Sequence, residues 1–354
     1  MSLSEAAVYV KKFLRYFVIA LGGLGVVWAL VWVGINFLPN LLGGPKADYA
    51  FGVMPKPTIP QNTTSKGVNF VLDTVDGKFP NLPKILAAYQ SAPLSPDIMG
   101  PIRSTQLAAN FGFANGPAVL DSQTYRFTDQ RKVAQSIVLN IGTQNFSVAA
   151  DYAKANFSGP APNNAAQDLI DQTRSFLRTH SILPDEMSNS KATVTYWRID
   201  GNSSVKVGSI DAANFARVDF FRNDVNSYPI VGPLKDQGQI YVGVKSNALD
   251  SNGITEMHYT FWQYSTDKKG FYPLLPVDQA FQNLQNGQAS LISPTTVNFK
   301  DVRVNKITLA YYQDDNYEPY LEPIYLFDGF GTAPDGSEVS TRFYLPAIDP
   351  RYLK

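Results

Sequence analysis

The side chains best able to do chemistry are few in this chain. Cysteine is absent, which excludes thiol catalysis, disulfides and cysteine metal sites. Histidine occurs twice, so a histidine-based triad must use His180 or His258. A structural interpretation is favoured for both: His180 follows a predicted helix, where an imidazolium suits the helix dipole, and His258 falls on the polar, surface phase of a predicted strand. No phosphate-binding loop, dinucleotide fingerprint, nucleophile elbow or paired-histidine zinc motif occurs, so we expect no catalytic residue, no cofactor and no enzymatic activity.

The best candidate for a cation site is an acidic cluster near the C-terminus. Asp314, Asp315 and Glu318 lie between two predicted strands, and Glu322 lies beyond them. Calcium binds several oxygens supplied by a tight loop, and these carboxylates supply some of them. The cluster lacks the alternating acidic spacing of a calcium loop, so ordinary acidity of a hairpin loop is the favoured interpretation. No bound metal is predicted.

A candidate partner surface lies in the same region. Tyr312, Tyr317 and Tyr320 belong to an aromatic-rich stretch, and the last two flank Pro319 at a predicted loop. Tyrosine is enriched at the energetic centres of protein interfaces. The alternative is that these rings pack the last sheet of the protein.

Composition favours a β-rich, globular protein. Aromatic residues make up 13% of the chain and charged residues only 17%, which suits half-buried pleated surfaces. Thirty basic and thirty acidic residues cancel, so no basic field exists to attract nucleic acid, and none is predicted as a partner. The 354 residues are enough for two or three compact domains.

One apolar stretch predicts a membrane anchor. Phe17–Leu38 holds no charged residue, and a helix of this length spans roughly 33 Å, about the thickness of the hydrocarbon core. Lys11, Lys12 and Arg15 precede it, which places the N-terminus in the cytoplasm and the rest outside. The alternative is a cleaved signal peptide, but the run is long and no small-residue cleavage site follows it promptly. The prediction is a single-pass protein of the cell membrane with an extracytoplasmic body.

The remaining sequence predicts repeated helix-plus-strand units. Helices are predicted at 102–111, at 165–179 and directly after Pro276, each followed by strands with period-two alternation. A bulge or bend is expected at Asn305–Lys306, where the alternation changes phase. The predicted fold class is α+β, with each helix covering one face of an antiparallel sheet. The predicted divisions are a cytoplasmic lead at 1–16, the transmembrane helix at 17–38, a Pro-rich stalk at 39–64, and α+β units at 65–160, 161–270 and 271–354, the third packed on the second.

Five segments follow one another in a recognisable order. They are YPIVGP, IYVGVKSNALDSNGITEMHYTFWQY, YPLLPVDQAFQNLQNGQA, ITLAYYQDDNYEPYLEPIYLFDG and TRFYLPAI. Over about Ala165 to Ile348 this order resembles the extracytoplasmic YycH/YycI-type regulatory proteins and related PepSY-like modules of bacterial envelopes. The resemblance implies tandem PepSY- or cystatin-like units that bind another envelope protein, a partner that in the family includes a sensor histidine kinase. The Pro-rich stalk and the extra unit near residues 100–150 depart from that pattern.

Three functions remain open at this point. The favoured one is a membrane-anchored, non-enzymatic module that binds a protein partner and regulates an envelope signalling system. The second is a structural or assembly protein that positions components of the cell envelope. The least favoured is a wall hydrolase, which needs two carboxylates roughly 5 to 9.5 Å apart in a cleft.

Overall fold

The computed structural model describes residues 21–28, 30–32, 45–61, 67–94, 98–129, 134–152, 154, 159–245, 253–294 and 299–354. The chain forms two units, Met1–Asp48 and Tyr49–Lys354. Both large sheets and the named helices belong to the second unit.

The prediction of a transmembrane helix over Phe17–Leu38, which lies in the first unit, is not supported. The described residues 21–28 and 30–32 of this unit are helical. Within the described part of the chain, no helix is both long and apolar enough to cross a membrane. The rest of the predicted span, like the lead at 1–16, lies outside the described residues.

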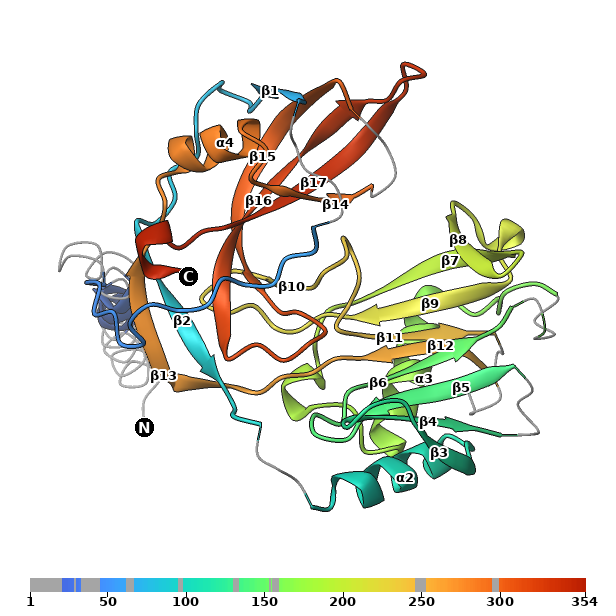
Figure 1. The fold of residues 1–354 in the computed structure, drawn as a ribbon. Helices are drawn as coiled ribbons and strands as arrows, with labels where there is room; N and C mark the ends of the chain where they lie inside the picture. Colours follow the sequence, from blue (N-terminus) through green and yellow to red (C-terminus); the bar gives the residue numbers. More distant parts are fainter. Residues whose placement is uncertain are drawn as a thin grey trace, which may run out of the picture. The chain divides into compact units, whose positions relative to one another are not determined.

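In the described residues, the larger sheet of the second unit has nine strands, all paired antiparallel (Figure 1). Two helices, α2 (Gly100–Asn110) and α3 (Ala166–Thr179), contribute to the single core on one of its faces. Helix α3 presents Leu169, Phe176 and Leu177 to that core, as its 3.6-residue stripe predicted. In spatial order the strands are β3 (Asn115–Val119), β4 (Thr124–Thr128), β5 (Gln135–Asn140), β6 (Phe146–Ala150), β12 (Ile254–Tyr259), β11 (Ile240–Val244), β9 (Phe215–Phe220), β7 (Ala192–Asp200) and β8 (Ser203–Val207).

The smaller sheet has eight strands among the described residues and packs on a second core. Helix α4 (Val277–Gln285) packs against it, with the Phe281 and Phe327 rings 6.5 Å apart. The register of β15 and β16 shifts between Val304 and Lys306, which confirms the predicted bulge. The strands are β1 (Asn69–Leu72), β15 (Asp301–Tyr312), β16 (Tyr320–Thr332), β17 (Glu338–Pro346) and β14 (Ser290–Ser293), joined by β10 (Ile230–Val231), β2 (Ile85–Ser91) and β13 (Tyr264–Pro273).

The predicted fold class, a transmembrane helix followed by tandem PepSY- or cystatin-like helix-on-sheet units, is wrong. The described part of the chain is mostly β, with 41% of its residues in strands and 18% in helices. Strands distant in sequence pair directly: β2 pairs with β13 and β16, and β6 pairs with β12. The sheets are therefore shared among segments that the tandem scheme kept apart. Hydrophobic alternation indicates which face of a strand is buried, but it does not specify the neighbouring strand.

Much of the predicted stalk belongs to the body. Met54 is fully buried, its N–H donates to the Tyr352 carbonyl at 2.9 Å, and its own carbonyl accepts from the Lys354 N–H. Ile59 is 6% exposed and packs on the face of β15 and β16. Residues 49–61 are thus packed chain rather than a spacer. Pro-rich segments can form extended spacers or can run along the surface of a folded body, and composition alone does not distinguish these two arrangements.

Candidate functional site

A groove opens where the chain passes from the nine-stranded to the eight-stranded sheet. The crossing segment, Tyr259 to Tyr264, leaves the end of β12 and enters β13. Two pockets of about 500 and 540 Å³ adjoin here and share five lining residues. We call their combined space the junction groove. Its shared lining consists of Ser181, Ile182, Tyr259, Phe261 and Gln263.

Aromatic side chains form the floor of the junction groove. Phe146 on β6 is 4% exposed, and its ring stacks on Tyr259 with centroids 5.1 Å apart. Burial raises the pKa of Tyr259 to about 12, so its hydroxyl remains protonated at neutral pH. Trp262 is anchored by its indole N–H, which donates to the Asp314 carbonyl at 2.9 Å. The floor is therefore apolar and fixed in position.

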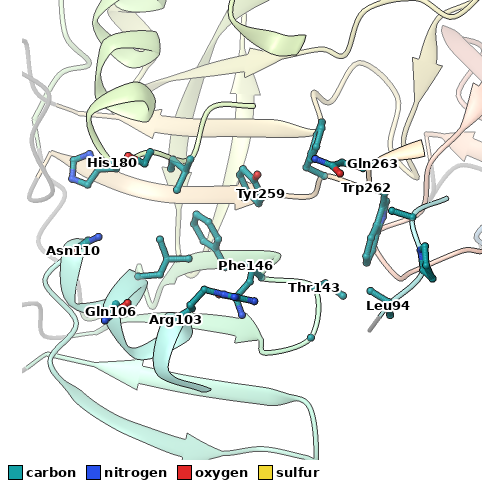
Figure 2. A pocket seen from close by; sticks show the side chains of 18 residues that line it. Leu94, Arg103, Gln106, Asn110, Thr143, Phe146, His180, Tyr259, Trp262 and Gln263 are labelled. Carbon is teal, nitrogen blue, oxygen red and sulfur yellow. The ribbon is translucent and has the colours of Figure 1, made fainter. Parts of the chain in front are cut away.

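Amide side chains and one arginine form the wall on the α2 side. Arg103, Gln106 and Asn110 follow at helical spacing and are exposed. Figure 2 shows them across the gap from His180 and Tyr259, with Phe146 between. This wall offers donors and acceptors but little apolar surface.

Two groove residues have left-handed backbone conformations without being glycine. Gln144 has φ +61° and Ser181 has φ +56°. The side-chain amide of Gln144 donates to the Ile141 carbonyl at 2.8 Å and to Ser104 Oγ at 3.2 Å, which holds the turn in place. Such conformations cost about 1–3 kcal/mol each and cluster at ligand clamps. Their occurrence on both sides of the junction groove supports its choice as the candidate site.

His180 lies at the C-terminal end of α3 and lines the junction groove, as well as capping the helix as expected. Its Nδ1 lies 2.9 Å from the Phe176 carbonyl. A carbonyl only accepts, so Nδ1 donates, and in the neutral ring Nε2 is the acceptor. The ring also stacks on Phe111 with centroids 5.1 Å apart. His180 is thus held in one tautomer and one orientation.

A buried arginine supports the floor from behind. Arg222 is 3% exposed, and its Nη1 donates to the Trp262 carbonyl at 2.6 Å and to Gln313 Oε1 at 2.7 Å. Its Nε donates to Glu186 Oε1 at 2.6 Å. The guanidinium also lies over the Phe261 ring, 4.6 Å from its centroid. Arg222 therefore ties the crossing segment to the β15–β16 loop and to the wall at Glu186.

The predicted partner tyrosines do not form one surface. Tyr312 is fully buried, and its hydroxyl donates to Asp314 Oδ2 at 2.7 Å. Tyr320 packs on Phe51 with centroids 4.9 Å apart. Tyr317 is half-buried and packs edge-on against Trp262 at 5.2 Å, so it is the predicted tyrosine that adjoins the junction groove.

The predicted cation ligands point to different partners. Asp314 Oδ1 accepts from the Asn316 N–H at 2.7 Å, while Glu318 Oε1 accepts from the Thr58 N–H at 2.5 Å. Asp315 Oδ1 lies 3.0 Å from His258 Nε2. Among the residues that the structure describes, no three His, Asp or Glu side chains are grouped to hold a metal ion. The structure does not bring Asp314, Asp315 and Glu318 together as a cation site.

His258 is more buried than the expected surface side chain, at 16% side-chain exposure. Its Nε2 contacts both Asp315 Oδ1 and Thr260 Oγ1, each at 3.0 Å. A catalytic triad uses opposite ring nitrogens for the nucleophile and the orienting acid, so this arrangement is not a triad. Burial alone would raise the pKa of Asp315, but the hydrogen bond and charge of His258 outweigh it and hold that pKa below its usual value.

A polar cluster on the other face of the nine-stranded sheet was missed by sequence reasoning. The Arg217 guanidinium lies between the Trp197 and Tyr241 rings, 4.4 and 4.5 Å from their centroids. Its Nε donates to Asp219 Oδ2 at 2.9 Å. Burial raises the pKa of Asp219 and also that of Glu256. The signal was present in the strand FARVDF, where both charges alternate with apolar residues. Glu256 Oε2 accepts from the Tyr152 hydroxyl at 2.7 Å.

Comparison with known proteins yields little. No protein-family model matches the chain, and no curated protein matches it. Among solved structures, an uncharacterized protein from Eubacterium rectale is similar, with 10% sequence identity, a TM-score of 0.43, and coverage of 79% of this chain and 88% of that chain. A likeness at this level carries no argument about function. The resemblance to YycH/YycI-type proteins therefore stays a prediction.

Proposed function

We propose that the protein is a non-enzymatic binding module that recognises a protein partner through the junction groove. The observation that carries this proposal is the continuous groove itself, which combines a fixed aromatic floor with walls of amide side chains. Each of its two pockets falls within the roughly 300–1,000 Å³ typical of ligand sites. Aromatic residues and arginine are also the types enriched at protein interfaces.

The chemistry of the groove supports binding rather than catalysis. His180 donates its Nδ1 hydrogen to a backbone carbonyl, whereas the base of a triad is oriented by a carboxylate. Glu186 is held in an ion pair with Arg222. The carboxyl groups whose pKa burial raises do not line the groove: Asp219 and Glu256 belong to the polar cluster, and Glu318 and Glu322 lie at the β15–β16 loop and on β16. The hydrolase interpretation thus gains no support from the residues that line the groove.

The test is partner capture by matched variants of the full chain. Gln263→Ala and Arg103→Ala change exposed groove side chains, and Arg198→Ala changes an exposed side chain on β7 as the control. We expect the partner captured by wild-type protein and by the control to bind both groove variants measurably more weakly in isothermal titration calorimetry. Equal affinity for all four proteins would overturn the proposal.

The identity of the captured partner separates two interpretations that the sequence left open. A sensor kinase or another signalling protein would indicate a regulator. A protein of wall or surface-layer assembly would indicate a structural role. Both interpretations use the same groove, so the variants above apply to either.

A further inference from the structure

We propose that the polar face of the nine-stranded sheet binds a free α-amino acid between Arg217 on β9 and Glu256 on β12. The guanidinium receives the carboxylate of the ligand, and the Glu256 carboxylate receives its ammonium group. Neither residue lines the junction groove, so this inference is independent of the proposed function.

Strand pairing places these two opposite charges beside each other. Arg217 lies opposite Gly243 on β11, and Gly243 lies opposite Glu256. Cross-strand partners point to the same face of a sheet, and here that face is turned away from the core that contains Val218 and Met257. A Cβ added at Gly243 would lie 2.7 Å from Glu256 Cγ. The Glu256 side chain therefore lies over a glycine, with no side chain on β11 to separate it from Arg217.

The two charges are held by other residues and not by each other. Among the described residues, no hydrogen bond or ion pair joins Arg217 to Glu256. Asp219 Oδ2 accepts from Arg217 Nε at 2.9 Å, and no described residue accepts from Nη1 or Nη2, the fork that suits a carboxylate. The Tyr152 hydroxyl donates to Glu256 Oε2 at 2.7 Å, and no described residue donates to Oε1. Donors and an acceptor thus remain for a ligand that carries both charges.

The guanidinium is fixed in one orientation before a ligand binds. It lies between the Trp197 and Tyr241 rings, 4.4 and 4.5 Å from their centroids, and its Nε is bonded to the buried Asp219. The Arg217 side chain is only 10% exposed. Charge-assisted hydrogen bonds are stronger where water is largely excluded, and an ordered site does not have to be ordered by its ligand. A planar carboxylate can lie in the plane of the guanidinium between the same two rings.

The pair of charges favours an amino acid over ligands with a single charge. A simple carboxylate would bind Arg217 but would be repelled by Glu256, and a simple amine would meet the reverse. A free α-amino acid carries both groups on one carbon, whereas a peptide carries them on different residues. Burial raises the pKa of Glu256, and a bound ammonium group would favour its ionised form.

The experiment titrates the full chain with each of the common L-amino acids in isothermal titration calorimetry. We expect at least one to bind. Acetylating the amino group of that ligand, or converting its carboxylate to the amide, should weaken binding roughly tenfold or more, because each change removes a charge-assisted hydrogen bond.

Three variants test the two binding groups separately. Arg217→Lys keeps the charge but loses the fork, so the amino acid should bind roughly tenfold more weakly. Glu256→Gln should also weaken the amino acid, yet it should bind the N-acetyl derivative more tightly than wild type does, because the charge that repels the carboxylate is gone. Unfolding cannot produce that gain. Arg198→Lys, an exposed change on β7, should leave every affinity unchanged.

Several results would overturn the inference. They are binding of no amino acid, equal binding of the blocked derivatives, and no gain for the N-acetyl derivative in Glu256→Gln. Loss of amino-acid binding in Gln263→Ala would place the ligand in the junction groove and would overturn it as well. Partner capture tests the proposed function separately from all of these results.

Discussion

Replacing Arg222 by methionine tests whether one buried side chain holds the two sheets together. The guanidinium bonds to the Trp262 carbonyl and to Gln313 Oε1, and it pairs with Glu186. Methionine fills a similar volume but leaves the Trp262 carbonyl and Gln313 Oε1 without a donor. Each unsatisfied buried acceptor lowers the free energy of unfolding by about 1–3 kcal/mol. Removing the buried charge recovers some desolvation cost, so we expect a net loss of about 3 kcal/mol in the free energy of unfolding.

Glu186, the exposed partner of Arg222 in this ion pair, provides a comparison variant for the loss of stability. The Glu186 side chain is 37% exposed, so Glu186→Gln leaves a group that water can solvate, and Arg222 keeps its other two acceptors. We expect a loss of about 1 kcal/mol or less for that variant, as for an exposed ion pair. Arg198→Met, on the surface of β7, should change stability by no more than about 0.5 kcal/mol.

Urea denaturation followed by tryptophan fluorescence and by circular dichroism measures all three variants. Coincident transitions are required before a free energy is extracted. A loss below 1 kcal/mol for Arg222→Met would refute the reasoning. So would a larger loss for Glu186→Gln than for Arg222→Met, because exposure would then not decide the cost.

Three further predictions concern other regions of the second unit. The pKa of Asp315 is lower in the folded than in the unfolded chain. The ionised Asp315 therefore stabilises the fold above the unfolded pKa of about 3.8, and this stabilisation is lost as pH falls through the folded pKa. Melting temperatures measured from pH 6 to 2 should fall less for Asp315→Asn than for wild type, and parallel curves would contradict this. An added Cβ at Gly238 would lie 2.7 Å from a backbone nitrogen of β9, whereas a Cβ at Gly208 would enter open space. In urea denaturation, Gly238→Ala should therefore lower the free energy of unfolding by about 1–3 kcal/mol, and Gly208→Ala should not. Equal effects of the two variants would exclude the steric explanation. Met54 is fully buried, so Met54→Ala should cost about 2–5 kcal/mol, and a neutral result would mean that residues 49–61 are not part of the folded body.

Local elements were predictable because their signals are local. Strand β7 begins at Ala192 and ends at Asp200 as its alternation indicated, and α3 ends at Thr179 before the expected His180. Strand β2 was not predicted. Its sequence ILAAYQS is buried along most of its length, so it lacks the alternation that marks a half-exposed strand.

The candidate site was harder to predict than the elements that form it. The junction groove is lined by residues of α2, the end of α3, the β5–β6 turn and the crossing segment at 259–263, which only the strand order brings together. The aromatic stretch near Tyr317 pointed to the right neighbourhood, but burial removed Tyr312 from it. Charge and aromatic content suggest which residues recognise a partner, but where those residues lie in space depends on the strand order of the sheets.

The pairing of β2 with distant strands has a consequence for synthesis on the ribosome. Tyr311, on β15, donates its hydroxyl hydrogen to the Ala87 carbonyl across 224 positions of the chain. At translation rates of about 5–20 residues per second, the apolar segment around Ala87 waits about 11 to 45 s for this partner to emerge. Until β13 emerges to pair with it, the nascent chain exposes an unpaired, aggregation-prone strand, so its yield in cells is expected to depend on chaperones that shield it.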